Sequence, residues 1–142
     1  MIKAKEDTFH LGVKALIRSP NKEILLLERS LFNKNYWDLP GGRLQKGESL
    51  LQTLKREITE ETGLNDIGNV QPFITVLTDI RIQNAQEDVG LVFSIFLCDI
   101  NHAFSPQLSD EHINFKWLSP YECLEKLKQY PSPFADKLIN LC

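Results

Sequence analysis

The sequence predicts an α/β fold in which a mixed β-sheet lies between helices, and three observations support this. First, β-rich segments occur on both sides of one amphipathic helix, expected at Leu50–Thr62. Second, Val89–Ile100 is apolar on both faces, which is typical of a central strand covered on two sides. Third, a helix start follows near the end of the chain, with Ser119 as cap and Pro120 at the first position. A chain of 142 residues fits one domain, 1–142, with a sizeable core.

The first part of the chain predicts a β-hairpin followed by an irregular segment. His10–Arg18 is rich in apolar residues, and the turn signal Ser19-Pro20-Asn21 separates it from a second strand at Glu23–Glu28. We expect Leu31–Tyr36, which mixes polar and aromatic residues, to be a loop. Trp37–Pro40 is expected to be a short extended segment.

The part after the central helix predicts further strands and two helical segments. In order, we expect a strand at Val70–Ile80, a polar connection at Gln83–Asp88, the central strand, a short strand at Asn114–Leu118, a helix from Pro120 to about Gln129, and a helical turn or two within Phe134–Leu141.

The central helix carries its own start and stop signals. Ser49 is a good N-cap, and Gln52 three residues later completes a capping-box pattern. Gly63 suits the left-handed position just past a helix end. At ~100° per residue, the apolar side chains fall on one stripe, which must pack on a core: Leu50, Leu51, Leu54 and Ile58.

Three glutamates share a second face of this helix. Glu57, Glu60 and Glu61 are spaced i, i+3, i+4, and this face borders the apolar stripe, with Glu61 at the margin. Like charges so close repel each other, whereas Mg²⁺ takes carboxylates together with substrate phosphates. The cluster therefore predicts a metal site, and the alternative is a solvated acidic surface.

The segment Gly42–Leu64, which reads GRLQKGESLLQTLKREITEETGL, contains a complete Nudix box. On these residues the chain resembles a Nudix hydrolase, and its size resembles a small MutT-like member. The resemblance implies a Nudix-type α/β/α sandwich and Mg²⁺-dependent hydrolysis of a diphosphate linkage in a nucleoside diphosphate derivative, such as an NTP or NDP-sugar. Water attacks phosphorus in such a reaction, and Mn²⁺ is a possible substitute for Mg²⁺.

The resemblance also implies roles for residues inside the box. Glu57, Glu60 and Glu61 are expected as metal ligands, with a backbone carbonyl at Gly42. Glu57 and Glu60 are also expected in catalysis, together with Arg56, which orients the glutamates. Two further residues support the site: Glu48, which pairs with Arg56, and Gly63 at the helix end.

The general base is open, because family members place it differently. Glu111 in Ser109-Asp110-Glu111-His112 is our candidate, and a box glutamate is the alternative. Asp110 and His112 are neighbouring alternatives, although a surface position is favoured for His112. Glu87 and Asp88 are within possible reach, but a polar hairpin loop explains them equally well.

Substrate recognition is predicted from aromatic and basic side chains near the box. Aromatic rings can stack on a base, and basic side chains can meet phosphate or ribose. The candidates are Arg29, Tyr36, Trp37 and Arg43. Packing at the edge of the core is the alternative explanation, above all for Trp37.

Composition limits the partners. A net charge of −3 and a pI near 5.6 argue against an extended nucleic acid or an anionic membrane as partner. The longest nearly apolar run, Val89–Cys98, is too short to span a bilayer, and the start of the chain lacks the hydrophobic run of a signal peptide. The three cysteines are odd in number and widely spaced, which favours reduced thiols and a cytoplasmic protein. Family habit makes a homodimer possible.

Two other functions remain as alternatives. One is a Nudix-fold nucleotide-binding module without catalysis, which the intact Glu57, Glu60 and Glu61 argue against. The other is an isomerase of the same fold acting on an isoprenoid diphosphate. The short chain, and the lack of cysteine just before the box, argue against that activity.

Overall fold

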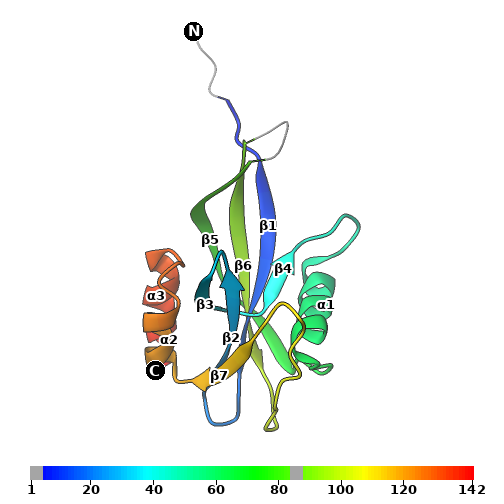
Figure 1. Cartoon of the computed structure of the whole chain (residues 1–142), viewed down its shortest axis with the longest axis vertical. Coiled ribbons are helices and arrows are strands. Elements are labelled where there is room, and N and C mark those ends of the chain that lie inside the picture. The colour runs from blue at the N-terminus through cyan, green and yellow to red at the C-terminus, as the bar shows by residue number, and fades with distance from the viewer. Residues whose placement is uncertain (1–4, 84–87) are drawn as a thin grey trace.

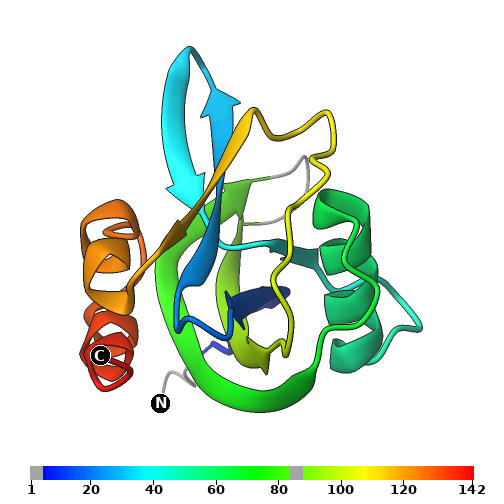
Figure 2. The same cartoon turned by 90° about the horizontal axis from the view of Figure 1, so that it is seen from below.

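The computed structural model describes residues 5–83 and 88–142. These residues form a mixed seven-stranded sheet with α1 on one face and α2 and α3 on the other (Figures 1 and 2). The predicted sheet between helices is therefore confirmed. The elements are β1 (Phe9–Arg18), β2 (Ile24–Leu31), β3 (Lys34–Asp38), β4 (Gly41–Arg43), α1 (Leu50–Thr62), β5 (Asn69–Gln83), β6 (Asp88–Asp99), β7 (Asn114–Leu118), α2 (Pro120–Lys126) and α3 (Ser132–Ile139).

The sheet has the strand order β3-β2-β1-β6-β5, with β4 paired to β1 and β7 paired to β2. β1 and β6 run parallel from the pair Phe9 and Gly90 to the pair Arg18 and Asp99, and the other strand pairs are antiparallel. β6 thus lies inside the sheet, which confirms the predicted central strand. β4 was not predicted, because three residues leave no periodic pattern.

The expectation of a loop at Leu31–Tyr36 is wrong. β2 continues to Leu31, which pairs with Lys34, and β3 returns antiparallel along β2. Phe32 and Asn33 form the turn with φ values of 51° and 62°. Two positive φ values match the tight turn whose twist suits a hairpin. The sequence did not predict this turn, because Phe at its first position is not a usual turn residue.

The second helix is shorter than expected. α2 ends at Lys126 with Leu127 as its C-cap, rather than near Gln129. The Gln129 side chain instead donates a hydrogen bond to the Trp37 carbonyl oxygen at 2.7 Å. This contact ties the connection between α2 and α3 to the end of β3.

Two hydrophobic clusters lie on opposite faces of the sheet. β2 illustrates why, since Ile24 and Leu26 belong to the cluster under α2 and α3, whereas Leu25 and Leu27 belong to the cluster under α1. Alternate side chains of a strand point to opposite faces, so a fully apolar run fills both clusters. Full burial of each such side chain stabilises the fold by about 1.5–3 kcal/mol.

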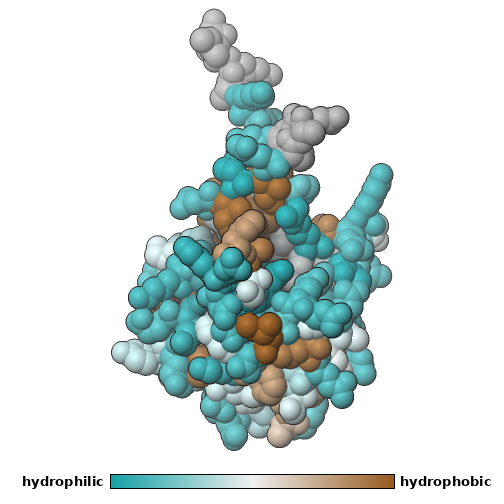
Figure 3. Space-filling model, in the orientation of Figure 1, coloured by the Kyte–Doolittle hydropathy of each residue, from teal (hydrophilic) through white to brown (hydrophobic). Residues whose placement is uncertain are grey.

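The face shown in Figure 3 is mostly hydrophilic, with a few hydrophobic groups, some of them over the protruding end of the sheet. The most exposed large hydrophobic side chains are Phe32, Tyr121 and Leu77. Among the described residues, none of the helices has the length and apolar character needed to cross a membrane.

Candidate active site

The ends of α1 are capped as the sequence predicts. The Ser49 hydroxyl accepts a hydrogen bond from the Gln52 amide, and the Gln52 side-chain oxygen accepts one from the Ser49 amide. Gly63 ends the helix at φ 79°. Leu54 and Ile58 are fully buried against the sheet, so the helix cannot rotate, and its acidic face is held toward β4.

A cavity of about 390 Å³ lies where α1 faces β4, the end of β2 and the loop before β7. Its lining is mostly polar and combines carboxylates, guanidinium groups and glycine backbone. The lining residues are Arg29, Gly41, Gly42, Gln45, Arg56, Glu57, Glu60, Glu61, Ser109 and Glu111. The fold therefore brings together the box glutamates, Arg56 and the predicted base Glu111, although Glu111 is fifty residues further along the chain.

Arg56 holds three carboxylates in place. Its Nε lies 2.7 Å from Glu48 Oε2, and its Nη1 lies 2.8 Å from Glu57 Oε1 and 3.5 Å from Glu60 Oε2. The expected pair of Glu48 and Arg56 is present, and hydrogen bonding to Arg56 lowers the pKa of Glu48 to about 2. Glu48 also accepts from the Thr53 hydroxyl at 3.0 Å, so the loop before α1 is fastened to the helix.

Glu61 is the buried member of the acidic face. It is only 5% exposed, and the Gly41 amide donates to its carboxylate at 3.3 Å. The pKa of Glu61 is raised to about 8, mainly by burial and to a smaller extent by Glu57, while Lys14 and the Gly41 amide oppose the shift. A cation placed between Glu57 and Glu61 would favour the ionised carboxylates and so counteract this raised pKa.

His112 is not on the surface, contrary to the expectation from the sequence. It is 7% exposed, and its Nε2 lies 3.8 Å from Glu61 Oε2. Its Nδ1 lies 3.3 Å from the Ser109 hydroxyl oxygen. Burial is the main cause that lowers the pKa of His112. A single histidine in a polar loop carries no sequence signal for burial, because the contact with α1 is made across the fold.

The donor set suits a hard divalent cation. All candidate ligands are oxygen atoms, as Mg²⁺ and Mn²⁺ prefer. A Cβ atom at Gly42 would lie 2.3 Å from Glu57 Oε1, so the missing side chain is what admits the carboxylate. Within residues 5–83 and 88–142, no three His, Cys, Asp or Glu side chains are arranged as a metal-binding group, and the Glu60 side chain is 60% exposed. The two inner carboxylates are nevertheless enough for Mg²⁺ that also binds substrate phosphates.

A second cavity of about 250 Å³ adjoins the first, and the two share Arg29, Gly41 and Gly42. Its other lining residues are Gly12, Lys14, Asp38, Arg43, Leu91 and Phe93. Predicted substrate residues Arg29 and Arg43 therefore border this space. Lys14, Asp38 and Phe93 were not predicted, because each occurs inside a strand pattern that packing alone explains.

Tyr36 and Trp37 do not line either cavity among the described residues. Tyr36 pairs with Arg29 across the β2–β3 hairpin. Trp37 is half-buried against the cluster under α2 and α3, and the Lys116 Nζ lies 5.2 Å from its ring centroid. The structure thus places Trp37 where core packing is the simpler explanation. Glu87, one of the other acids considered as a base, lies outside the described residues.

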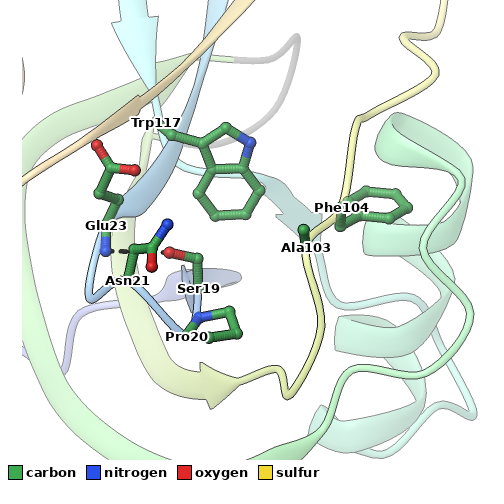
Figure 4. Close-up of a pocket in the computed structure, with 7 residues that line it drawn as sticks. All are labelled: Ser19, Pro20, Asn21, Glu23, Ala103, Phe104 and Trp117. Atoms are coloured by element: carbon green, nitrogen blue, oxygen red, sulfur yellow. Dashed lines mark hydrogen bonds between the residues drawn. The ribbon is translucent and has the colours of Figure 1, made fainter.

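A further pocket of about 270 Å³ lies at the turn between β1 and β2 (Figure 4). Trp117 from β7 faces Ala103 and Phe104 across it, and Ser19 accepts a hydrogen bond from the Glu23 amide at 3.2 Å. This pocket shares no lining residue with the two cavities.

Comparison with known structures supports the fold. A MutT protein from Methanosarcina mazei Go1 has a TM-score of 0.70 and 29% sequence identity, covering 97% of this chain and 96% of that one. The E. coli dihydroneopterin triphosphate pyrophosphohydrolase has a TM-score of 0.73, with 94% and 97% covered. Its identity is only 18%, so that similarity shows the fold alone.

Comparison with known sequences leads to the family. A putative 8-oxo-dGTP diphosphatase from Bacillus subtilis is 31% identical over 109 residues, which are 77% of this chain and 66% of that protein. The nucleoside triphosphatase NudI of Salmonella typhimurium is 33% identical over 91 residues, 61% of this chain and 63% of that protein. The chain spans from about a fifth to two thirds of the length of the first curated relatives it matches. The NUDIX domain itself matches residues 8–138, and with this match over nearly its whole length the chain belongs to the Nudix family.

Proposed function

We propose that the chain is a Mg²⁺-dependent pyrophosphohydrolase that cleaves a diphosphate linkage in a nucleoside diphosphate derivative. The observation that carries this proposal is the first cavity, in which the carboxylates of Glu57 and Glu61 meet the cationic side chains of Arg29 and Arg56. Such a mixture suits a metal-bound polyphosphate, since both the ion and the phosphates find partners. The names of the relatives favour a nucleoside triphosphate as the substrate class.

Glu57 and Glu61 would hold the cation, with the Gly42 carbonyl and Glu60 as further ligands. A bound divalent ion supplies neutralisation of the phosphate charge and polarisation of a phosphate oxygen. Arg56 keeps Glu57 in place through its 2.8 Å ion pair. Arg29, on β2, binds a phosphate oxygen from the opposite side of the cavity.

Glu111 is the proposed general base. It lines the same cavity as Glu57 and Glu61, on the loop before β7. Its carboxylate takes a proton from a water molecule while the water oxygen forms a bond to phosphorus and the phosphorus–oxygen bond of the anhydride breaks. His112 links this loop to Glu61 of α1, and Ser109 contacts His112 within the loop.

The second cavity would receive the part of the substrate beyond the diphosphate. It adjoins the first cavity and combines Phe93 with the charged groups of Lys14, Asp38 and Arg43. An apolar wall with a few polar groups is the usual lining for such a group.

The test is incubation with Mg²⁺ and each of dGTP, 8-oxo-dGTP, NDP-sugars, dinucleoside polyphosphates and ADP-ribose, followed by chromatographic separation of the nucleotide products. We expect turnover of at least one nucleotide and a loss of at least ~10²-fold in kcat for Glu57→Gln. Glu125→Gln, which changes an exposed glutamate paired with Lys128, is the matched control. Equal turnover by Glu57→Gln and the wild type would disprove the metal site. Nucleotide binding without turnover would indicate the catalytically inactive binding module instead.

A further inference from the structure

A chain of buried polar contacts lies behind the second cavity, and one of its members, Tyr130, has no role in the hydrolysis described above. The Tyr130 hydroxyl donates to Asp38 Oδ1, and Lys14 Nζ lies 3.1 Å from Asp38 Oδ2. The Lys14 and Asp38 side chains are only 8% and 13% exposed. Burial of an unpaired charge is expensive, so the three groups depend on one another.

Tyr130 comes from the connection between α2 and α3, far from the cavity in sequence. Its ring packs against Phe134 at 4.8 Å and Phe93 at 5.5 Å between centroids. Burial and the charge of Asp38 raise the pKa of Tyr130 well above its usual value. The hydroxyl therefore stays protonated and remains a donor to Asp38.

Asp38 and Lys14 border the second cavity and are held there by further contacts. Asp38 Oδ1 already accepts from the Leu39 amide at 2.8 Å as well as from Tyr130. Lys14 Nζ also lies 3.4 Å from the Leu39 carbonyl oxygen and 5.4 Å from the centroid of the Phe93 ring. An acceptor at Asp38 Oδ2 and a donor at Lys14 thus lie side by side next to an aromatic ring. Both side chains line the cavity, whereas Tyr130 is not part of the lining.

We propose that Tyr130 is a positioning residue, which acts through Asp38 and Lys14 on the affinity for the part of the substrate beyond the diphosphate. The proposal rests on the proposed function for the placement of that part in the second cavity. The physical reason is preorganisation. Without the hydroxyl, Asp38 Oδ1 loses one of its two hydrogen bonds, and Asp38 and Lys14 are no longer held in a single orientation. The first cavity, with Glu57 and Glu61, does not contact Tyr130 and keeps its affinity for phosphates.

The experiment compares two ligands on one variant, Tyr130→Phe, which removes only the hydroxyl. The probes are the non-hydrolysable α,β-methylene analogue of dGTP and inorganic pyrophosphate, each titrated calorimetrically with Mg²⁺. We expect the dissociation constant of the nucleotide analogue to rise about tenfold, because binding must then restore the orientation of Asp38 and Lys14 that the hydroxyl holds in the free protein. That of pyrophosphate should stay within about twofold, because pyrophosphate reaches only the first cavity.

Two matched controls separate positioning from general loosening. Tyr121→Phe makes the same change at an exposed tyrosine of α2, and Gln129→Ala removes the neighbouring contact to the Trp37 carbonyl. Both should bind both probes like the wild type. If Tyr130→Phe is poorly folded, Asp38→Asn, which keeps the side-chain size, should give the same separation between the two probes.

Two results would overturn the proposal. One is equal affinity of Tyr130→Phe and the wild type for the nucleotide analogue, including no binding by either. The other is an equal loss for both probes, which would indicate a structural role only. Both readouts are dissociation constants and do not depend on turnover. A failure of the proposed hydrolysis would appear separately, as a lack of turnover by the wild type.

Discussion

At the residue scale, Gly42 shows that a glycine can be required for space rather than for its backbone angle. Its φ is not in the left-handed region, and it pairs with Val13 in a regular antiparallel register. The space that a Cβ would take is filled by the Glu57 carboxylate, 2.3 Å from the ideal Cβ position. The absence of a side chain at Gly42 therefore leaves room for the Glu57 carboxylate between α1 and β4.

We predict that Gly42→Ala lowers kcat by about 10–10²-fold, because the added methyl group displaces the Glu57 carboxylate, and a displacement of about 1 Å is enough for such a loss. Stability should change little, since the displaced group is the end of a flexible side chain. Steady-state kinetics and urea unfolding measure the two effects. An unchanged kcat would mean that the position of Glu57 does not matter.

The raised pKa of Glu61 leads to a second prediction at this scale, which concerns how the stability of the metal-free protein depends on pH. Its folded-state pKa of about 8 lies above the ordinary value of 4.5. The folded protein therefore holds a proton that the unfolded chain releases, and stability falls as pH rises from about 4.5 through 8. In the presence of a chelator, Glu61→Gln should be more stable than the wild type at pH 8, and the difference should shrink toward pH 5. Thermal unfolding across this range measures it.

Added Mg²⁺ should reverse the order found at pH 8. A ligand that binds only the folded state raises the unfolding temperature, and the wild type has the carboxylate that Glu61→Gln lacks. A larger Mg²⁺-induced shift in the variant than in the wild type would contradict the assignment of Glu61 as a ligand.

At the scale of elements, α1 is specified by its own sequence from cap to cap. Ser49 and Gln52 satisfy amide groups at its start, and the Gly63 amide donates to the Thr59 carbonyl at its end. The left-handed φ at Gly63 is needed to reverse the chain toward buried Leu64. The element that carries the glutamates is thus also the one whose bounds the sequence predicts best.

We predict that Gly63→Ala costs about 1 kcal/mol of stability, because an alanine is disfavoured at φ 79°. The added Cβ meets only Gln107 at 3.5 Å, so strain in the backbone is the whole effect. Gly63→Asn should cost less, since asparagine tolerates this region better. Chemical unfolding gives the numbers, and equal stability of Ala and Gly would show that the C-cap has no energetic role.

At the scale of the whole molecule, the two faces of the sheet have different tasks. The side covered by α1 holds the first cavity, with the glutamates on the helix itself, whereas the cluster under α2 and α3 supports the sheet from the other side (Figure 2). Leu138 and Phe134 on α3 are at most 1% exposed and belong to that second cluster. Substitutions in this cluster should lower the amount of folded protein more than they lower the kcat of each folded molecule.

We predict that Leu138→Ala costs about 2–5 kcal/mol of stability by leaving a cavity. The neighbouring Ile139 is 50% exposed, and Ile139→Ala should stay within about 1 kcal/mol as the matched control. The kcat per folded molecule should be close to the wild-type value in both variants. Urea unfolding with active-site titration separates the two quantities, and equal losses of stability for both variants would contradict the core assignment.

The oligomeric state and a cytoplasmic location also belong to this scale, and both stay predictions. Substrate identity is likewise a prediction, because most residues around the second cavity come from β1, β2, β3 and β6, which the box does not include.

The elements of this fold differ in how well the sequence predicts them. Long periodic segments such as β1, β6 and α1 were predicted because the burial of alternate or helically spaced side chains is written into local order. The hairpin turn at Phe32 and Asn33 and the short strand β4 were missed. In the first case the turn residues are unusual, and in the second the strand exists only because β1 offers a partner.

By itself, the sequence determined the capped helix α1 and the acidic face with its Glu48–Arg56 brace, since these depend on residues close together in the chain. It also predicted a sheet between helices, from the order of its local strand and helix patterns. Only the tertiary structure decided that His112 is buried beside Glu61 and that Lys14, Asp38 and Tyr130 meet behind a second cavity. Those contacts join segments tens of residues apart. The pairing of strands and the packing of α2 and α3 bring them together, and no local pattern of residue types encodes such a distance.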